Sequence, residues 1–233
     1  MRESYFWHKM HSLTGVVPTG FYMLQHLTLN SFTIASPEKF NSVIDFFEGV
    51  PKHLLLALEI LVLWIPILFH AIYGLFIVGR GNPSNYFTTK FKFSQNLMYS
   101  LQRWSGIYLF LFLIYHVITT TVAKYVQGSA EVIKYAAWQE KLTANGHIVF
   151  ILYLLGILAA SYHLAYGVWN FCIRWGITIN EKSQLAVQKF SFVMFIAVTL
   201  LGWGALAGFL MHHPEAPTQL EAHHSLSQHL NNT

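Results

Sequence analysis

Four histidines that could ligate a metal lie one apiece inside four apolar stretches of the chain. They are His26, His70, His116 and His163, and few other ionisable residues lie near them. An ionisable side chain in a hydrocarbon environment is costly and usually marks a cofactor, a proton path or a partner. Imidazole is the commonest metal-ligating side chain, and facing helices of a bundle can hold a haem between them. The four histidines therefore predict two haems, each held by two imidazoles.

The composition and the hydropathy pattern predict a membrane protein. Of the 233 residues, 54% are hydrophobic and only 10% are charged, which lies outside the usual range of soluble domains. Five apolar stretches reach, with their flanks, the roughly 20 residues that a helix needs to cross a bilayer: 13–32, 54–78, 107–122, 147–173 and 190–210. We therefore expect an all-α membrane protein whose five transmembrane helices form a haem-binding bundle in residues 1–211. A soluble helical protein is the alternative.

Lysines and arginines are unevenly distributed between the two sides of the expected bundle. Nine lie on the side of the N-terminus, namely Arg2, Lys9, Arg80, Lys90, Lys92, Arg103, Arg174, Lys182 and Lys189. Five lie on the other side among acidic residues, namely Lys39, Lys52, Lys124, Lys134 and Lys141. Because cytoplasmic loops are enriched in these residues, we expect the N-terminus in the cytoplasm and the C-terminus outside. The net charge of +4 is too small to indicate a nucleic-acid partner.

Three further features limit the chemistry. The N-terminal residues lack the pattern of a cleavable signal, so the first helix is expected to be a permanent anchor. Cys172 is the single cysteine, which excludes an internal disulfide and a cysteine-held iron–sulfur cluster within this chain alone. Residues 212–233 are polar and contain five histidines; we expect a solvated, disordered tail, with metal binding as the alternative.

The depth of the four histidines predicts how they pair. His70 and His163 each lie about three turns, roughly 15 Å, before the cation that ends their helix on the cytoplasmic side. His116 lies about two turns before the outer end of its helix, and His26 lies in the second half of an outward-running helix. We therefore expect an inner pair, His70 with His163, and an outer pair, His26 with His116. Zinc is less favoured because no carboxylate or thiolate gathers with them.

Small residues near the histidines leave room for a flat macrocycle or for close helix packing. Helical spacing places Gly74 on the face of His70, Gly156 and Gly167 on the face of His163, and Gly15 on the face of His26. The segments 12–15 and 103–106, Ser-Leu-Thr-Gly and Arg-Trp-Ser-Gly, also echo one another at the starts of two helices. Glycines 202, 204 and 208 predict close packing of the fifth helix.

The position of several polar and aromatic residues near the expected helix ends predicts their role. Five cationic residues on the cytoplasmic side are candidates to bind the carboxylates of the inner haem by charge-assisted hydrogen bonds: Lys9, His11, Arg80, Arg103 and Arg174. An interfacial aromatic belt is the expected place of Trp7, Trp104, Trp138 and Trp175. A polar position at the interface is expected for His8, His11, His53 and His147.

Several motifs resemble one family. They are Lys9-Met10-His11-Ser12-Leu13-Thr14-Gly15 with Leu24-Gln25-His26, Ala57-Leu58-Glu59-Ile60 with His70-Ala71-Ile72-Tyr73-Gly74, Leu101-Gln102-Arg103, and Trp175-Gly176-Ile177-Thr178 with Ser183-Gln184. In combination they resemble the dihaem cytochrome b subunit, of the b558 type, of succinate dehydrogenase and fumarate reductase. The likeness covers nearly the whole chain except the tail, and it is greatest to single-subunit, five-helix anchors.

The resemblance implies a bacterial cytoplasmic-membrane anchor for a flavoprotein subunit and an iron–sulfur subunit on the cytoplasmic side. It implies two haem b groups with His26, His70, His116 and His163 as axial ligands. Electrons from succinate would reach menaquinone near the outer face, and the chain itself would not oxidise succinate. Acidic candidates at the quinone site are Glu59, Asp45 and Glu48. Glu59 is the one carboxylate inside an expected span and could equally have a structural partner.

Two other functions stay open on the residues alone. One is a dihaem anchor of another quinone-linked enzyme, such as a hydrogenase or a formate dehydrogenase, which would share the haems but have other partners. The other is a haem-free transporter or proton channel that uses the histidines as a relay.

Overall fold

The structure, a computed structural model, describes residues 2–80 and 93–212, and it is helical in nearly all of this range, with no strand among these residues. Four helical segments are long and apolar enough to cross a membrane: Lys52–Arg80, Ser94–Gln127, Tyr135–Arg174 and Glu181–Met211. The predicted all-α class and multi-pass membrane character are therefore confirmed. Lys90, Lys92 and the predicted tail from residue 213 lie outside the described residues.

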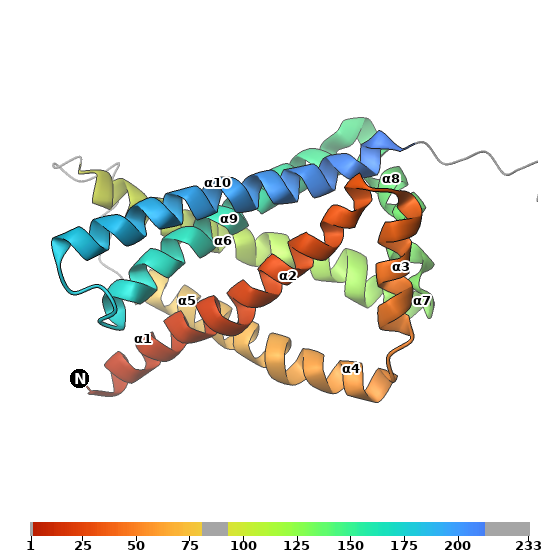
Figure 1. The fold of residues 1–233 in the computed structure, drawn as a ribbon. Helices are drawn as coiled ribbons and strands as arrows, with labels where there is room; N and C mark the ends of the chain where they lie inside the picture. The colour runs from red at the N-terminus through yellow and green to blue at the C-terminus, as the bar shows by residue number, and fades with distance from the viewer. Residues whose placement is uncertain (1, 81–92, 213–233) are drawn as a thin grey trace, which may run out of the picture.

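The long helices run side by side in a bundle (Figure 1). The second long segment along the chain comprises α4 (Lys52–Leu58), η3 (Glu59–Trp64) and α5 (Ile65–Arg80), and the third comprises α6 (Ser94–Val117), η4 (Ile118–Val122) and α7 (Ala123–Gln127). The last two are α9 (Ile148–Arg174) and α10 (Glu181–Met211). α9 packs against both α6 and α10 and so forms the centre of the bundle.

The first predicted span lies within one continuous helical segment. It comprises α1 (Arg2–Thr14), η1 (Gly15–Gly20) and α2 (Phe21–Asn30), so it begins well before the apolar stretch 13–32. η1 is a π-helical turn around Pro18, which has no N–H to donate to the helix ladder. α1 packs against α5 and α2 packs against α10, and Figure 1 shows the segment crossing the bundle from end to end.

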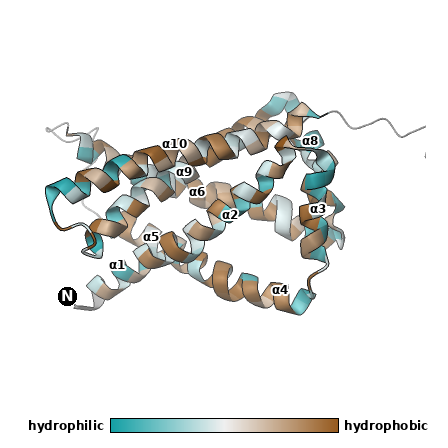
Figure 2. Ribbon diagram, in the orientation of Figure 1, coloured by the Kyte–Doolittle hydropathy of each residue, from teal (hydrophilic) through white to brown (hydrophobic). Residues whose placement is uncertain are grey.

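Apolar side chains cover the outside of the bundle. Figure 2 shows hydrophobic residues along α4, α5 and α10, with hydrophilic residues concentrated towards the helix ends. Large residues such as Leu61, Leu68, Ile72 and Leu111 are more than half exposed. Since a soluble protein rarely exposes so large an apolar surface, this surface is suited to lipid.

Short helices close one end of the bundle, which we call the distal end because it lies opposite the N-terminus. α3 (Pro37–Glu48) begins with Ser36 as N-cap, whose hydroxyl accepts from Lys39 N at 3.2 Å, and with Pro37 at the first helical position. α3 runs across the end of the bundle (Figure 1). The second short helix there is α8 (Tyr135–Thr143). It is separated from α9 by η6 (Ala144–His147), whose last three residues have positive φ.

The predicted interfacial position of Trp138 is wrong. Trp138 is only 8% exposed and belongs to the apolar core at the distal end. Its ring lies 5.2 Å from that of Tyr153 on α9 and 5.9 Å from that of Phe209 on α10. The reversal at η6 folds α8 back onto the two long helices, which brings its aromatic face inside. Trp7 and Trp104 are exposed, as expected of belt residues.

Close packing of α10 is confirmed. A side chain at Gly202 would overlap Ile157 of α9, and one at Gly208 would overlap Thr33 and the backbone beside it. Thr33 is fully buried and its hydroxyl donates to the carbonyl of Ala205 at 2.7 Å. The small residues of α10 therefore allow it to approach both α9 and the turn after α2.

His212, the first residue of the predicted tail, is attached to the bundle. Its carbonyl accepts from Gln139 Nε2 at 2.7 Å, and its ring lies within hydrogen-bond distance of the Ile34 carbonyl, 3.3 Å away. The structured part of the chain thus includes this residue.

Candidate metal centre

The four histidines lie in two pairs within the bundle. The ring centres of His70 on α5 and His163 on α9 are 6.0 Å apart, with their planes at 89°. The ring centres of His26 on α2 and His116 on α6 are 5.9 Å apart, with their planes at 85°. Two imidazoles that bind one metal from opposite sides have ring centres about 6 Å apart, since each metal–nitrogen bond is about 2 Å. Each pair therefore has the spacing of two axial ligands.

Among the described residues, neither pair belongs to a larger cluster of metal-ligating side chains. Within residues 2–80 and 93–212 no group of three or more His, Cys, Asp or Glu side chains could hold a metal ion. A structural zinc site needs four protein ligands and a catalytic one usually three. Two ligands on opposite sides instead suit a metal whose other positions are filled by a macrocycle.

Hydrogen bonds hold the proximal pair, His70 and His163, in position. The His70 Nδ1–H donates to the carbonyl of His11 at 2.8 Å, which leaves the lone pair on Nε2. His163 Nδ1 lies 3.2 Å from the Ser105 hydroxyl, and that hydroxyl donates to the carbonyl of Gln102. The Ser105 oxygen is thus placed to accept from His163 Nδ1, an arrangement that leaves the lone pair on Nε2 as in His70.

Two glycines provide the space for the proximal pair. A Cβ at Gly15 would overlap the ring of His70, and one at Gly106 would lie 2.9 Å from Cε1 of His163. Both glycines come from the echoed segments 12–15 and 103–106. The two similar segments therefore have the same structural role: each provides a glycine against which a histidine of the next long helix packs. Helical spacing places Gly15 on the face of His26, and in the structure Gly15 packs against the His70 ring of another helix.

Aromatic and hydroxyl groups surround the distal pair, His26 and His116. His116 Nδ1 lies 3.0 Å from the hydroxyl of Tyr153, and the His26 ring stacks on Tyr22 at 5.7 Å. Thr120 donates its hydroxyl hydrogen to the carbonyl of His116 at 2.6 Å. These partners limit the rotation of both rings.

The two pairs lie at different depths. Tyr153 marks the level of the distal pair on α9, and His163 belongs to the proximal pair on the same helix. Ten residues of helix separate them, a rise of about 15 Å. The histidine rings that lie next to each other in the structure are those that were predicted to lie at the same depth.

The predicted cationic residues gather at the end of the bundle nearer the proximal pair. His11 stacks on His70 with ring centres 4.1 Å apart and planes at 11°. Arg174 donates to the carbonyl of His8 at 3.2 Å, and Lys9 lies over the Trp175 ring at 4.8 Å.

The other two cationic candidates also have partners there. Arg103 donates to the carbonyl of Val78 at 2.7 Å, and Arg80 lies 4.3 Å over the Phe76 ring.

The three carboxylate candidates differ in their surroundings. Glu48 pairs with Lys124 at 2.6 Å, and Asp45 pairs with Lys134 at 3.2 Å, both at the distal end. Glu59 lies half-buried at the start of η3, and its Oε2 atom is buried without a hydrogen-bond partner. A buried unsatisfied oxygen calls for a bound water or ligand.

The turn η3, at whose start Glu59 lies, packs against η1 of the first helical segment. Among the three candidates, Glu59 is the one with a buried oxygen that has no hydrogen-bond partner among the described residues.

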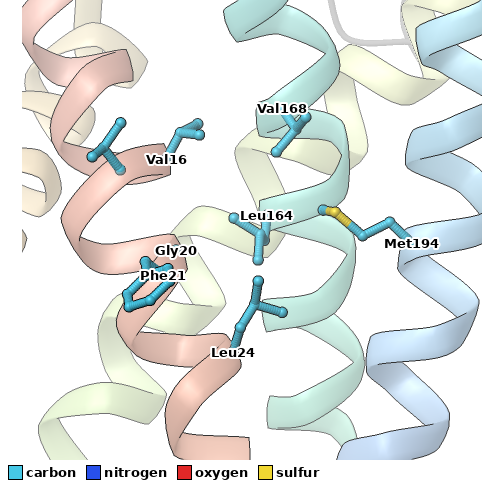
Figure 3. Close-up of a pocket in the computed structure, with 8 residues that line it drawn as sticks. Val16, Gly20, Phe21, Leu24, Leu164, Val168 and Met194 are labelled. Atoms are coloured by element: carbon cyan, nitrogen blue, oxygen red, sulfur yellow. The ribbon is translucent and has the colours of Figure 1, made fainter.

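An apolar groove lies on the outside of the bundle, apart from both pairs. Figure 3 shows Val16, Gly20 and Phe21 of the first helical segment facing Leu164 and Val168 of α9 and Met194 of α10. The groove measures about 290 Å³, and its lining side chains are apolar, with no group that could exchange a proton. Its chemistry suits a hydrocarbon chain.

Sequence reasoning missed several residues that support the pairs. Ser105 and Gly106 were visible in the echoed segments but had no assigned partner. Tyr22 lies one helical turn before His26, and that spacing was a usable signal. Tyr153 and the stacking of His11 had no local signal, since each contacts a histidine of another helix.

Replacing Gly15 with alanine tests the packing at the proximal pair. The added methyl group overlaps the His70 ring, and overpacking of this kind costs about 1–3 kcal/mol. We expect the variant to lose the metal centre held by the proximal pair and to keep the centre held by the distal pair. The number of metal ions bound per chain measures this. Gly79→Ala on α5 is the control, because a Cβ there meets nothing within 4 Å. A Gly15→Ala variant that binds as many metal ions as the wild type would contradict the assignment of a metal centre to the proximal pair.

Fold and site together define a class: a helical membrane protein in which four histidines lie as two separate pairs inside the bundle. The comparisons with known proteins agree with this class. The sequence model of the family described as "Succinate dehydrogenase/Fumarate reductase transmembrane subunit" matches residues 82–213. The succinate dehydrogenase cytochrome b558 subunit of Bacillus subtilis (strain 168) is 33% identical over 211 residues, which cover 90% of this chain and 98% of that protein. The chain belongs to the family of succinate dehydrogenase/fumarate reductase transmembrane subunits, and the resemblance drawn from its motifs is confirmed.

Proposed function

We propose that this chain is the dihaem anchor of a succinate:menaquinone oxidoreductase. Its function is to carry electrons between an iron–sulfur subunit on the cytoplasmic side and a menaquinone near the outer face. His70 with His163, and His26 with His116, would hold two haem b groups, which would supply the one-electron carriers. The observation that carries the proposal is the occurrence of two separate imidazole pairs, each at the spacing of axial ligands, inside an apolar helix bundle.

The surroundings of the pairs fit haem. His70 Nδ1 donates to the His11 carbonyl and His163 Nδ1 lies beside the Ser105 hydroxyl, and these contacts orient the two rings for ligation through Nε2. Histidine is a common axial ligand of haem iron. The stacked His11 ring and the cationic side chains near the proximal end would receive the haem carboxylates there.

The two ends of the bundle have separate tasks in this proposal. The proximal end, with the N-terminus and the bulk of the lysines and arginines, faces the cytoplasm and the two partner subunits. The first helical segment, Arg2–Asn30, crosses the membrane as a fifth span and contributes His26. On the distal side Glu59 transfers protons to or from the quinone, since its buried Oε2 has no hydrogen-bond partner among the described residues.

The complex with its partner subunits tests this function. We expect a reduced-minus-oxidised spectrum of two b-type haems per chain, and reduction of both by succinate in the presence of the flavoprotein and iron–sulfur subunits. A colourless chain that moves protons in liposomes would instead support the histidine relay. Two haems with hydrogenase or formate dehydrogenase subunits as partners would support the other dihaem anchor.

A further inference from the structure

One lysine at the distal end lacks a carboxylate partner although it is partly buried. Lys141, near the end of α8, donates to the main-chain carbonyls of Thr119 and Val132, both at 3.1 Å. An ammonium group has three donors, so one remains for a further acceptor. A cation removed from water is stabilised mainly by an opposite charge, and neutral carbonyls supply that only in part.

The other lysines of this region show the contrast. Lys124 pairs with Glu48, and Lys134 pairs with Asp45 and Glu131 at 3.2 and 2.8 Å. Both therefore have their counter-charge within the chain. Lys141, which is half-buried, has no carboxylate partner among the described residues of the distal end.

The position of Lys141 connects it to the distal histidine pair. Thr119, which accepts from Lys141, lies one turn beyond His116, within the π-helical turn η4 (Ile118–Val122). A π turn displaces the pattern of backbone hydrogen bonds in the helix by one residue. Different main-chain carbonyls are therefore left to accept hydrogen bonds from other groups.

The lysine is also held firmly in this place. Its ammonium lies 4.9 Å over the ring of Trp138, and Trp138 packs on Tyr153, the residue beside His116 Nδ1. The next residue of α8, Leu142, is fully buried in the distal core. Lys141 is therefore oriented by the core and does not rotate freely in water.

We propose that Lys141 binds a carboxylate of the haem held by His26 and His116. The inference rests on the dihaem function proposed above and adds the residue that receives the distal haem. Haem b carries two carboxylates on its edge, and an ammonium with a free donor binds a carboxylate through a charge-assisted hydrogen bond. The ammonium thereby neutralises a negative charge that would otherwise favour the more positive, oxidised iron.

Substitution of Lys141 by glutamine separates charge from hydrogen bonding. The amide still has two N–H donors for Thr119 and Val132 but carries no charge. We expect the distal haem to be reduced less readily by about tenfold in equilibrium constant, which for one electron is about 59 mV. Redox titration of the purified complex measures this, with the distal haem identified as the component lost in His26→Ala. Lys134→Gln, which removes a paired lysine at the same end, is expected to leave both potentials unchanged.

The outcomes distinguish this inference from the proposed function. A wild-type complex without haem would overturn both. A wild-type complex with two haems and an unchanged distal potential in Lys141→Gln would overturn the role of Lys141 alone. If Lys141→Gln loses the distal haem, Lys141→Arg decides: retention with arginine supports carboxylate binding, and the same loss with arginine indicates a purely structural lysine and overturns it.

Discussion

Replacing His70 with alanine is expected to remove one of two haems and to leave the other with its normal spectrum. His163→Ala is expected to remove the same haem, because the two ring centres lie 6.0 Å apart and the proposed function makes these residues the two ligands of one haem. His26→Ala and His116→Ala are expected to remove the other. Haem content per chain would fall by half in each case, as measured by pyridine haemochrome assay and by reduced-minus-oxidised spectra.

Double substitutions make the test of pairing sharp. Two residues that act as one unit are not additive. The variant His70→Ala with His163→Ala should therefore keep one haem, whereas His70→Ala with His26→Ala should keep none. A remaining haem in the second double variant would contradict the pairing. The control is His53→Ala, since His53 is exposed at the distal end and lies in neither pair.

Replacing Glu59 with glutamine is expected to slow quinone reduction by about 100-fold or more, because a positioned acid or base contributes at least that factor to proton transfer. Glutamine has nearly the same shape as glutamate but cannot give or accept a proton in this way. Reduction of the haems by succinate should be unchanged, since Glu59 belongs to neither histidine pair. Stopped-flow reduction of the haems and steady-state quinone reduction measure the two steps separately.

Two carboxylates of the same end provide matched controls. Glu48→Gln and Asp45→Asn each remove a charge that is already paired with a lysine at the surface. Exposed ion pairs contribute little, so we expect near-normal quinone reduction from both. Normal activity in Glu59→Gln, or a large loss in Glu48→Gln, would contradict the assignment of the proton-transferring group.

The sequence alone determined the class of protein and the residues that form the histidine pairs. Apolar stretches long enough to span a bilayer specify helices, because lipid offers the backbone no other hydrogen-bond partners. The depth of a residue along a helix follows from its count to the nearest charged end. For this reason the association of His70 with His163, and of His26 with His116, followed from counting along the chain.

Only the tertiary structure decided which residues support the histidines. Gly15 was placed with His26 by helical spacing, yet it packs against His70, because crossing of the helices brings residues of different segments together. Trp138 looked interfacial but is buried, since the reversal at η6 turns α8 onto α9. Lys141 appeared as one of several charged residues in a loop. Local periodicity specifies which face of a helix a residue occupies, whereas the angle at which helices cross and the direction in which loops return determine what that face meets.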